Sequence, residues 1–178
     1  MINIYGKGGH AKMIASLLEE TVSFYDDTDY YKAKDHPWII GIGDNGNRKK
    51  IAEIILKSAE FINIDLGIYV ASDVNIGIGT LIAPGSVIQN AATLGDHVII
   101  NTSASVDHDC EIGDYCHIAP NTTLCGAARI GAGTIIGAGS VILPGIEIGE
   151  NCIIGAGSVV TRNIPSGSKA YGNPAKIK

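Results

Sequence analysis

Aliphatic side chains recur at every sixth position through the second half of this 178-residue chain. From Val70 to Val160, each sixth residue is Ile, Val or Leu without exception. This period matches neither the 3.6 residues of a helical turn nor the two-residue alternation of an open sheet. It matches a prism with three short parallel strands per coil, each directing one aliphatic side chain to a shared axis. The repeat therefore predicts a parallel β-helix over residues 65–163.

The other positions of each repeat are also restricted. The fourth residue after each aliphatic is nearly always small, and Cys110, Cys116 and Cys152 occupy this position. A large side chain would overfill the inside of a corner, so we expect these cysteines to be core residues rather than disulfides or metal ligands. Glycine often follows the aliphatic directly, as at Gly113 and Gly131, and we expect such glycines to provide positive φ at the turns.

Composition and charge exclude several classes of protein. Hydrophobic residues make up 46% of the chain, which is enough apolar surface to form a folded core. The formal net charge of −5 disfavours nucleic acid or an anionic membrane as a partner, because both need a basic surface. No apolar run reaches the roughly 18 to 20 residues that cross a bilayer, and the N-terminus shows no export signal. We therefore expect a soluble, cytoplasmic protein.

Residues 1–64 follow a different pattern, in which short apolar segments alternate with helical ones. Strands are expected at residues 2–5, 22–25, 38–42 and 61–64. The segments after residue 9 and after residue 45 carry apolar residues at helical spacing. This alternation predicts a small, Rossmann-like α/β domain that precedes the β-helix, with a C-terminal tail over residues 164–178.

A glycine-rich turn links the first expected strand to the first expected helix. Gly6, Gly8 and Ala11 fit the pattern G-x-G-x-x-A, and Asp26 and Asp27 end the second expected strand. In a Rossmann-like unit this arrangement places backbone N–H groups against a phosphate, while the acid binds a ribose hydroxyl or a base. So short a domain is only half of a dinucleotide fold, which favours a mononucleotide-type ligand. The alternative is a tight turn beside an acidic loop.

The most polar stretch of the repeat contains a candidate general base, His108. Asp107, Asp109 and Glu111 surround it in sequence, and a neighbouring carboxylate raises the pKa of an imidazole and fixes its tautomer. The sequence does not decide which acid pairs with the histidine. Residues three repeats apart stack in successive coils, so the amide of Gly126 lies beside His108 and is a candidate oxyanion donor. The alternative is an ordinary surface histidine.

A column of small residues is expected along another corner of the prism. It consists of Pro120, Ala138 and Ala156, flanked by Gly137 and Gly155. Such a ladder of small residues forms a groove in which an extended, thin ligand can lie. His117 falls half a coil from His108, so the two histidines should face different sides of one subunit and could meet only across a subunit interface.

In combination, these segments resemble the bacterial sugar acetyltransferases of the NeuD/PglD type over essentially the whole chain. The resemblance is carried by Ile4-Tyr5-Gly6-Lys7-Gly8-Gly9-His10, Tyr25-Asp26-Asp27, Ile42-Gly43-Asp44-Asn45 with Arg48-Lys49-Lys50, Asn101-Thr102, Asp107-His108-Asp109-Cys110, Ile112-Gly113-Asp114 with His117, and Gly172-Asn173-Pro174-Ala175-Lys176. It implies a left-handed β-helix and a homotrimer with active sites between subunits. It also implies acetyl transfer from acetyl-CoA to the amine of a nucleotide-linked 4-amino-sugar, a UDP-4-amino-6-deoxyhexose, in surface glycan biosynthesis.

The resemblance further implies roles for individual residues. His108 would be the general base and Asp109 the acid that raises its basicity. The backbone at Gly126 would contact acetyl-CoA, which agrees with the oxyanion role expected from its place beside His108. Contacts to acetyl-CoA would come from His117, Gly137, Ala138, Gly155, Ala156 and Lys176. The nucleotide-sugar would be held by Gly8, Gly9, His10, Asp26, Asp27 and Gly43.

Two other functions are compatible with the sequence. An O-acetyltransferase acting on sialic acid or a related nonulosonate would use the same base on a hydroxyl group. A non-catalytic trimer, in which the β-helix is only a scaffold beside a nucleotide-binding module, would bind no acetyl-CoA. No metal is expected, because His97, His108 and His117 do not match the spacing of three-histidine zinc sites between facing subunits.

Overall fold

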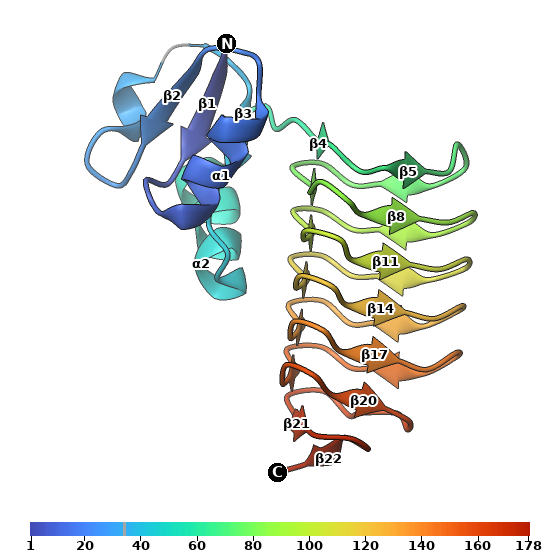
Figure 1. The fold of residues 1–178 in the computed structure, drawn as a ribbon. Helices are drawn as coiled ribbons and strands as arrows, with labels where there is room; N and C mark the ends of the chain where they lie inside the picture. Colours follow the sequence, from blue (N-terminus) through green and yellow to red (C-terminus); the bar gives the residue numbers. More distant parts are fainter. Residues whose placement is uncertain (34) are drawn as a thin grey trace.

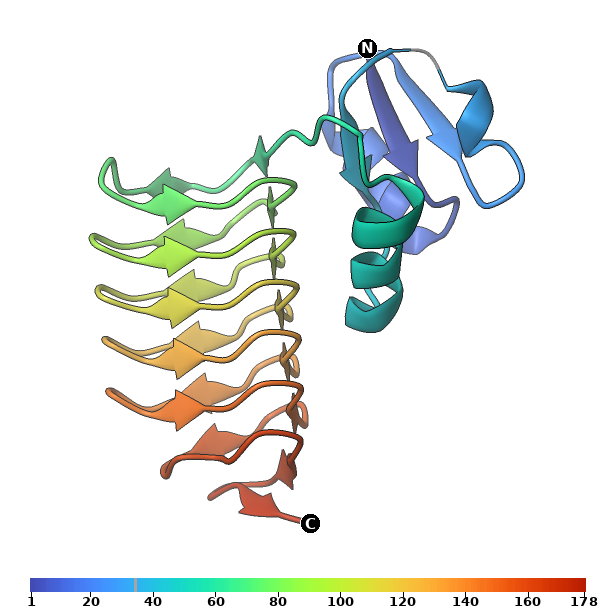
Figure 2. The same ribbon diagram turned by 180° about the vertical axis from the view of Figure 1, so that it is seen from behind.

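The computed structural model describes residues 1–33 and 35–178. A small α/β unit comes first along the chain, and a β-helix runs from it to the C-terminus (Figure 1). Figures 1 and 2 show the α/β unit beside the upper coils, with its second helix lying along one side of the β-helix. Within the described residues, no helix is both long enough and apolar enough to span a membrane.

The α/β unit is built on a three-stranded parallel sheet, sheet A. Its strands are, in spatial order, β2 (Val22–Tyr25), β1 (Ile2–Tyr5) and β3 (Trp38–Ile40). Helix α1 (Gly9–Leu17) follows β1 and buries Ala11 and Ile14. The predicted fourth strand is wrong, because Phe61 makes only an isolated parallel bridge to Trp38.

Helical segments fill the rest of the α/β unit. A short 3-10 turn, η1 (Tyr30–Lys32), follows β2, and α2 (Asn45–Lys50) continues directly into a π-helical turn, η2 (Ile51–Ile55). The side chain of Asp44 caps α2 by accepting a hydrogen bond of 2.8 Å from the backbone N–H of Asn47. The predicted helix after residue 45 is therefore present.

The β-helix is a triangular prism whose three faces are parallel sheets. Sheet B contains β4 (Ile64–Asp65), β7 (Leu81–Ile82), β10 (Ile99–Ile100), β13 (His117–Ile118), β16 (Ile135–Ile136), β19 (Ile153–Ile154) and β21 (Lys169–Tyr171). Sheet C contains β5 (Tyr69–Val70), β8 (Val87–Ile88), β11 (Ser105–Val106), β14 (Thr123–Leu124), β17 (Val141–Ile142) and β20 (Val159–Val160). Sheet D contains β6 (Asn75–Ile76), β9 (Thr93–Leu94), β12 (Glu111–Ile112), β15 (Arg129–Ile130) and β18 (Glu147–Ile148).

The coil of the prism is left-handed. In Figure 1 the strands of sheet C lie in front and run to the right, and the chain returns behind them as it descends. Successive coils pair in register, as Val106 does with Leu124. From β7 to β20 the second residue of each strand points to the axis, where Ile118 and Ile136 are fully buried. Cys110, Cys116 and Cys152, each the fourth residue after an aliphatic one, are buried beside this axis, as the repeat predicts.

The glycines that directly follow the aliphatic residues do not serve the predicted purpose. Positive φ occurs two residues further along each turn, for example at Tyr115 (φ 58°), and Gly113 itself does not adopt it. A Cβ on Gly113 would lie 2.7 Å from the backbone nitrogen of Ala132 in the next coil. These glycines therefore allow successive coils to stack closely, and the prediction that they supply positive φ is wrong.

The segment after residue 163 continues the prism. Strand β21 pairs in parallel with β19, and β22 (Lys176–Ile177) folds back antiparallel on β21. At the other end, β4 pairs with β7, so the β-helix begins at Ile64. Sheet B thereby runs past both ends of the predicted β-helical range.

Candidate active site

A cavity of about 280 Å³ opens at the carboxyl ends of the sheet A strands. This edge of a parallel sheet is where α/β folds bind their ligands. The lining residues are Tyr5, Gly6, Asp26, Asp27, Ile42, Asn47, Lys50 and Ile51. Asp26 and Asp27, both predicted to bind the nucleotide-sugar, are among them. The other predicted substrate residues are not part of this lining.

Gly8 and Gly9 lie at the start of α1, in the same loop as Gly6 of the cavity lining. Both are exposed, and no atom lies within 4 Å of the place where a Cβ would be at either residue. The first N–H groups of a helix have no acceptor within the helix, so they favour an anion such as phosphate. The open backbone at these glycines leaves room for a phosphate to approach.

The acidic residues of the cavity are already paired with other side chains. Lys7 lies 2.8 Å from Asp26 and 2.9 Å from Asp29, and the hydroxyl of Tyr5 donates to Asp27. The hydrogen bond from Lys7 holds the pKa of Asp26 well below its usual range. Burial and the hydrogen bond to Asp27 raise the pKa of Tyr5, so Tyr5 stays a neutral donor. Sequence reasoning missed Lys7 and Tyr5 as members of this site.

A second cluster lies between the α/β unit and sheet B, where the rings of His10 and His117 meet edge to face with centroids 5.4 Å apart. His117 Nδ1 lies 3.2 Å from the carbonyl oxygen of Gly43, and His117 Nε2 lies 3.0 Å from Nδ2 of Asn101. A carbonyl can only accept and an amide nitrogen can only donate, so His117 carries its proton on Nδ1. Burial chiefly, with Arg48 and His10, lowers the pKa of His117 to about 4.

This cluster joins residues that the sequence had assigned to different ligands. His10 and Gly43 were predicted to hold the nucleotide-sugar, and His117 was predicted to contact acetyl-CoA. A Cβ on Gly43 would lie 2.8 Å from Cε1 of His10, so the absence of a side chain there lets the imidazole pack on the backbone. Asn101 was not among the predicted site residues, and its part of the motif gave no indication of contact with His117.

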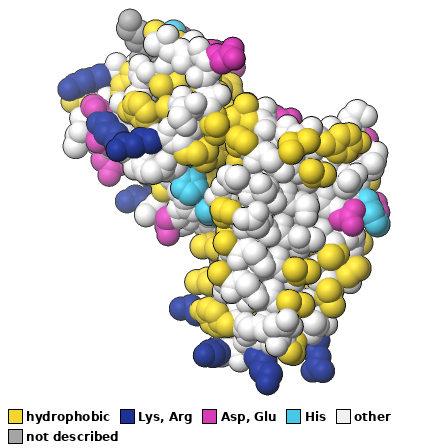
Figure 3. Space-filling view, in the orientation of Figure 1, with side chains coloured by type: hydrophobic (Ala, Val, Ile, Leu, Met, Phe, Trp, Pro, Cys, Tyr) yellow, Lys and Arg dark blue, Asp and Glu magenta, His cyan; other side chains and the backbone are white. Residues whose placement is uncertain are grey.

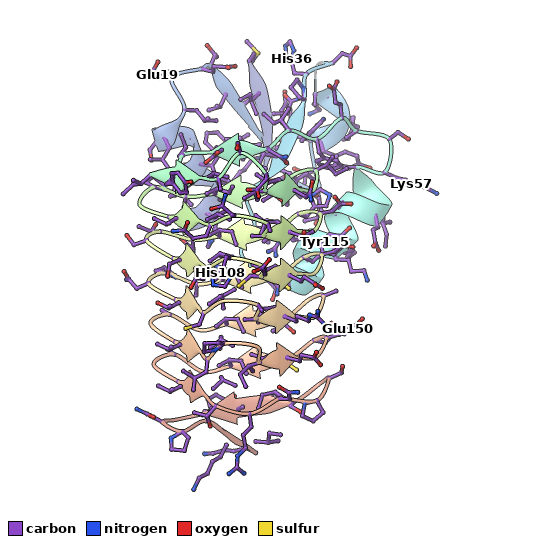
Figure 4. All side chains as sticks on the ribbon, turned by 90° about the vertical axis from the view of Figure 1, so that its right-hand side faces the viewer. Glu19, His36, Lys57, His108, Tyr115 and Glu150 are labelled. Atoms are coloured by element: carbon purple, nitrogen blue, oxygen red, sulfur yellow. The ribbon has the colours of Figure 1, made fainter. Side chains whose placement is uncertain are left out.

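His108 lies on the opposite side of the prism, at the corner between sheets C and D. Figure 4 labels it on the face turned away from the α/β unit. His108 Nδ1 lies 2.7 Å from Oδ2 of Asp109, while Asp107 accepts a 2.9 Å hydrogen bond from the backbone N–H of His108. The pairing acid is therefore Asp109. Its hydrogen bond, followed by the charge of Asp107, raises the pKa of His108, whose side chain is 60% exposed.

Gly126 lies against this imidazole in the next coil. A Cβ there would be 2.6 Å from Cε1 of His108, so only glycine lets the ring rest on the backbone at this position. Among the described residues, the N–H of Gly126 has no acceptor. The corner thus presents an imidazole Nε2 and a free amide side by side, the two groups that acyl transfer needs for a proton and an oxyanion.

The ladder of small residues lies at a third place, the corner between sheets B and C. Ala138 and Ala156 are exposed in successive turns, and the N–H of Gly157 donates to the carbonyl of Ala138 over 2.8 Å. Gly137 precedes Ala138 and permits close stacking on the next turn, whereas Gly155 precedes Ala156 and leaves room for the ring of Tyr171. Lys176 is exposed on β22, at the lower end of the prism, where Figure 3 shows several basic side chains.

The predicted catalytic and binding residues therefore occupy separate faces of one chain. Figure 3 shows histidine at the junction of the two regions and again, flanked by acidic side chains, at the far edge of the β-helix. One subunit does not bring His108 to the cavity or to His117. Within residues 1–33 and 35–178, no three His, Cys, Asp or Glu side chains gather into a group that could hold a metal ion.

Comparison with known proteins gives a family and several whole-chain likenesses. The family described as bacterial transferase hexapeptide (six repeats) matches residues 91–126 and 127–162. No curated protein matches the chain. PerB from Caulobacter crescentus, solved in complex with CoA and GDP-perosamine, is 33% identical with a TM-score of 0.91 over 99% of this chain and 96% of that chain.

Two further solved structures are similar over their whole length. The acetyltransferase domain of PglB from Neisseria gonorrhoeae FA1090, in complex with acetyl coenzyme A, is 28% identical with a TM-score of 0.91, covering 99% of this chain and 98% of that chain. WeeI from Acinetobacter baumannii AYE is 27% identical with a TM-score of 0.86, covering 100% of this chain and 99% of that chain. These likenesses confirm the predicted fold class, a Rossmann-like α/β unit followed by a left-handed β-helix.

Proposed function

Because the chain belongs to the bacterial transferase hexapeptide family, and within it to the sugar N-acetyltransferases, we propose that it acetylates the amine of a nucleotide-linked amino sugar with acetyl-CoA. The observation that carries the proposal is the His108–Asp109 pair resting on the free amide of Gly126. That arrangement supplies a base and an oxyanion donor at one exposed corner. The enzyme class is the predicted one, an acetyl-CoA-dependent acetyltransferase.

His108 acts as the general base in this proposal. Its Nδ1–H donates to Asp109, so Nε2 keeps a lone pair that can take a proton from the attacking amine. As the new N–C bond forms, the thioester oxygen gains negative charge, and the N–H of Gly126 stabilises it. The C–S bond then breaks, CoA leaves as a thiolate and is protonated, and His108 releases its proton to solvent.

The nucleotide part of the acceptor is proposed to bind in the cavity at the end of sheet A. Asp26, Asp27 and the backbone of Gly8 and Gly9 offer acceptors for ribose or base and donors for phosphate. We propose a UDP-linked 4-amino-6-deoxyhexose as acceptor. PerB was solved with GDP-perosamine, so a GDP-linked sugar is the direct rival that any substrate panel must include.

We further propose a homotrimer whose active sites lie between subunits, because the site is incomplete in one chain. The outward residues of sheet C carry no charge and are Tyr69, Val87, Ser105, Thr123, Val141 and Val159. Those of sheet D are Asn75, Thr93, Glu111, Arg129 and Glu147. Sheet C is thus the face suited to pack against a neighbour. It is bounded by the His108 corner and by the corner of Ala138 and Ala156, the proposed acetyl-CoA groove.

The proposed setting is the synthesis of a surface glycan in the cytoplasm. All four cysteines, Cys110, Cys116, Cys125 and Cys152, are free thiols. The reducing cytoplasm keeps thiols in that state. The exposed lysine Lys176 at the end of the prism is proposed to contact a phosphate of CoA.

A substrate panel tests the function directly. CoA release from acetyl-CoA would be followed with a thiol reagent in the presence of UDP-, GDP-, dTDP- and CMP-linked sugars, each as a 4-amine and as the matching 4-hydroxyl compound. Free nonulosonates would be included as further hydroxyl acceptors. We expect release with one or more amines and none with the hydroxyl compounds. Release only with hydroxyl acceptors, including free nonulosonates, would establish an O-acetyltransferase. No acetyl-CoA binding by calorimetry would leave only the scaffold function.

A further inference from the structure

Arg48 is a deeply buried cation whose hydrogen bonds, among the described residues, go to uncharged oxygens. Its side chain is on α2 and is 1% exposed. Among the described residues it makes no ion pair, and its donors go to five carbonyl oxygens and one amide oxygen. These hydrogen bonds run from Nε to His97 O (2.8 Å), from Nη1 to Ile42 O (3.0 Å) and Gly43 O (3.1 Å), and from Nη2 to Asn45 Oδ1 (2.9 Å), Tyr115 O (2.7 Å) and Cys116 O (3.1 Å).

These acceptors lie on both sides of the junction between the two regions. Ile42 and Gly43 follow β3 in the α/β unit, whereas His97 and Tyr115 belong to turns of two successive coils. The rings of His97 and Tyr115 stack with centroids 5.3 Å apart, and Figure 4 places Tyr115 beside the helical segment that carries Arg48. The hydrogen bonds of the planar guanidinium group therefore hold the loop after β3 against the side of the prism.

Arg48 also controls the surroundings of His117. The carbonyl of Gly43 accepts from both Arg48 and Nδ1 of His117, so its direction is fixed from two sides. A second hydrogen bond of Arg48 holds the carbonyl of Cys116, the residue directly before His117. The guanidinium thus restrains both the backbone that carries the imidazole and the acceptor of its proton.

The charge of Arg48 acts in the same direction as burial. Burial is the main cause that lowers the pKa of His10, His97 and His117, and the charge of Arg48 lowers each of them further. A buried cation surrounded by three imidazoles favours their neutral forms. A phosphate contact is a poor alternative role for Arg48, because its N–H groups are occupied by carbonyl and amide oxygens away from solvent.

We propose that Arg48 is a positioning residue for the acyl-transfer site, which holds the Gly43 carbonyl so that His117 keeps its proton on Nδ1 and presents its Nε2 lone pair beside Asn101. The inference rests on the proposed function, since the state of His117 affects catalysis only if the acceptor sugar reaches this cluster. The one acceptor of a neutral His117 is Nε2, which takes the hydrogen bond from Asn101, so an incoming amine would bind there by replacing Asn101 as the donor. A protonated imidazole would offer only donors and would repel an ammonium group.

The test compares Arg48→Met with Arg48→Lys and with a matched control, Lys49→Met, which removes an exposed cation from the next position of the same helix. Histidine-selective ¹⁵N NMR of the whole protein reports the tautomer and pKa of His117, whose signals are assigned from their loss in His117→Gln. In Arg48→Met we expect His117 to populate both neutral tautomers and its pKa to rise by about one unit or more. Arg48→Lys should restore the charge effect but not the single tautomer, because an ammonium lacks the planar fork.

Kinetics provide the second readout. Arg48→Met should lower kcat by about 10- to 100-fold while KM for acetyl-CoA stays within about twofold, and Lys49→Met should leave both unchanged. If circular dichroism shows that Arg48→Met does not fold, the tautomer and kcat of Arg48→Lys decide the question. A single Nδ1–H tautomer with unchanged kcat in a folded Arg48 variant would overturn the inference.

The NMR and kinetic results separate a failure of the proposed acetyltransferase function from a failure of the role proposed for Arg48. If the wild-type protein acetylates no nucleotide amino sugar while the His117 signals still depend on Arg48, the proposed function fails and the inference about catalysis falls with it. If the wild-type protein is active and the folded Arg48 variants keep both the wild-type signals and the wild-type kcat, only the role of Arg48 fails.

Discussion

The β-helix and the α/β unit are stabilised by different kinds of contact. In the β-helix one arrangement recurs in every coil, with an aliphatic side chain at the axis and a small one inside each corner. In the α/β unit and at its junction with sheet B, each polar contact is made once, as the Arg48 fork and the Tyr5–Asp27 pair illustrate. Because the core of the β-helix repeats in every coil, its exposed turn residues are not needed for folding and can take part in catalysis. We therefore expect catalysis and stability to be separable at His108 and coupled at Arg48.

The largest expected effect is the loss of the proposed base. Because His108 is exposed and contributes nothing to the axis of the prism, His108→Ala should lower kcat by about 10²- to 10⁴-fold without a change in melting temperature. Steady-state kinetics and a thermal melt on the same sample check both halves. Full activity in a folded His108→Ala protein would rule out this base.

A substitution at the axis should show the opposite behaviour. Ile136 is fully buried, so Ile136→Ala should lower the free energy of unfolding by about 2–5 kcal/mol through lost burial and a residual cavity. Below the melting temperature kcat should change by less than about threefold, because the turn at His108 keeps its backbone. Urea unfolding and kinetics measure the two effects, and a large loss of kcat at unchanged stability would break the comparison.

The close approach of Gly126 to His108 predicts an intermediate effect. A methyl group in Gly126→Ala would displace the imidazole, so kcat should fall by about 10- to 100-fold. In a His108→Ala background the same change should have almost no further effect, because the two residues act as one unit. Additive losses in the double variant would show that Gly126 acts independently of the imidazole.

The pH dependence of the rate tests the role of Asp109. Asp109 raises the pKa of His108, and the base works only when deprotonated, so the wild-type rate should fall as the pH drops through that raised pKa. Asp109→Asn removes the main cause of the shift, and the acidic limb should therefore move to lower pH while the plateau falls about tenfold. Asp107→Asn should move the limb less, since Asp107 is the second cause. An acidic limb that stays in place in Asp109→Asn would contradict the pairing.

The smallest expected effect concerns the charged ladder on sheet D. Arg129 lies 3.4 Å from both Glu111 and Glu147, but all three side chains are more than half exposed. Exposed ion pairs contribute little, so Arg129→Ala should change the free energy of unfolding by about 0–1 kcal/mol and leave kcat unchanged. A larger loss in urea unfolding would show that this face is covered in the assembly.

The same contrast explains how much of the molecule could be predicted. A repeated packing unit leaves its period in the sequence, so the prism, the buried Cys110 and the stacking of His108 on Gly126 followed from counting residues. Contacts made once leave no period. Arg48 reaches Tyr115 across 67 positions and Asn101 reaches His117 from the coil before it, and neither contact has a local signal. The fourth strand of sheet A was predicted wrongly for the same reason, since the local sequence does not show that Ile64 pairs with β7 in sheet B rather than in sheet A.

Subunit complementation shows whether His108 of one subunit works with the His117 cluster of another, as we propose. His108→Ala and His117→Ala, each expected to have little activity alone, would be co-expressed, and the mixed assemblies of the proposed homotrimer would be identified by native mass spectrometry. With random mixing in a trimer, an intact His108 meets an intact His117 at about one interface in four over the whole population and at about one in three within a mixed trimer, so we expect about a quarter of the wild-type activity in the unseparated mixture. Mixed trimers without any recovered activity would contradict this proposal.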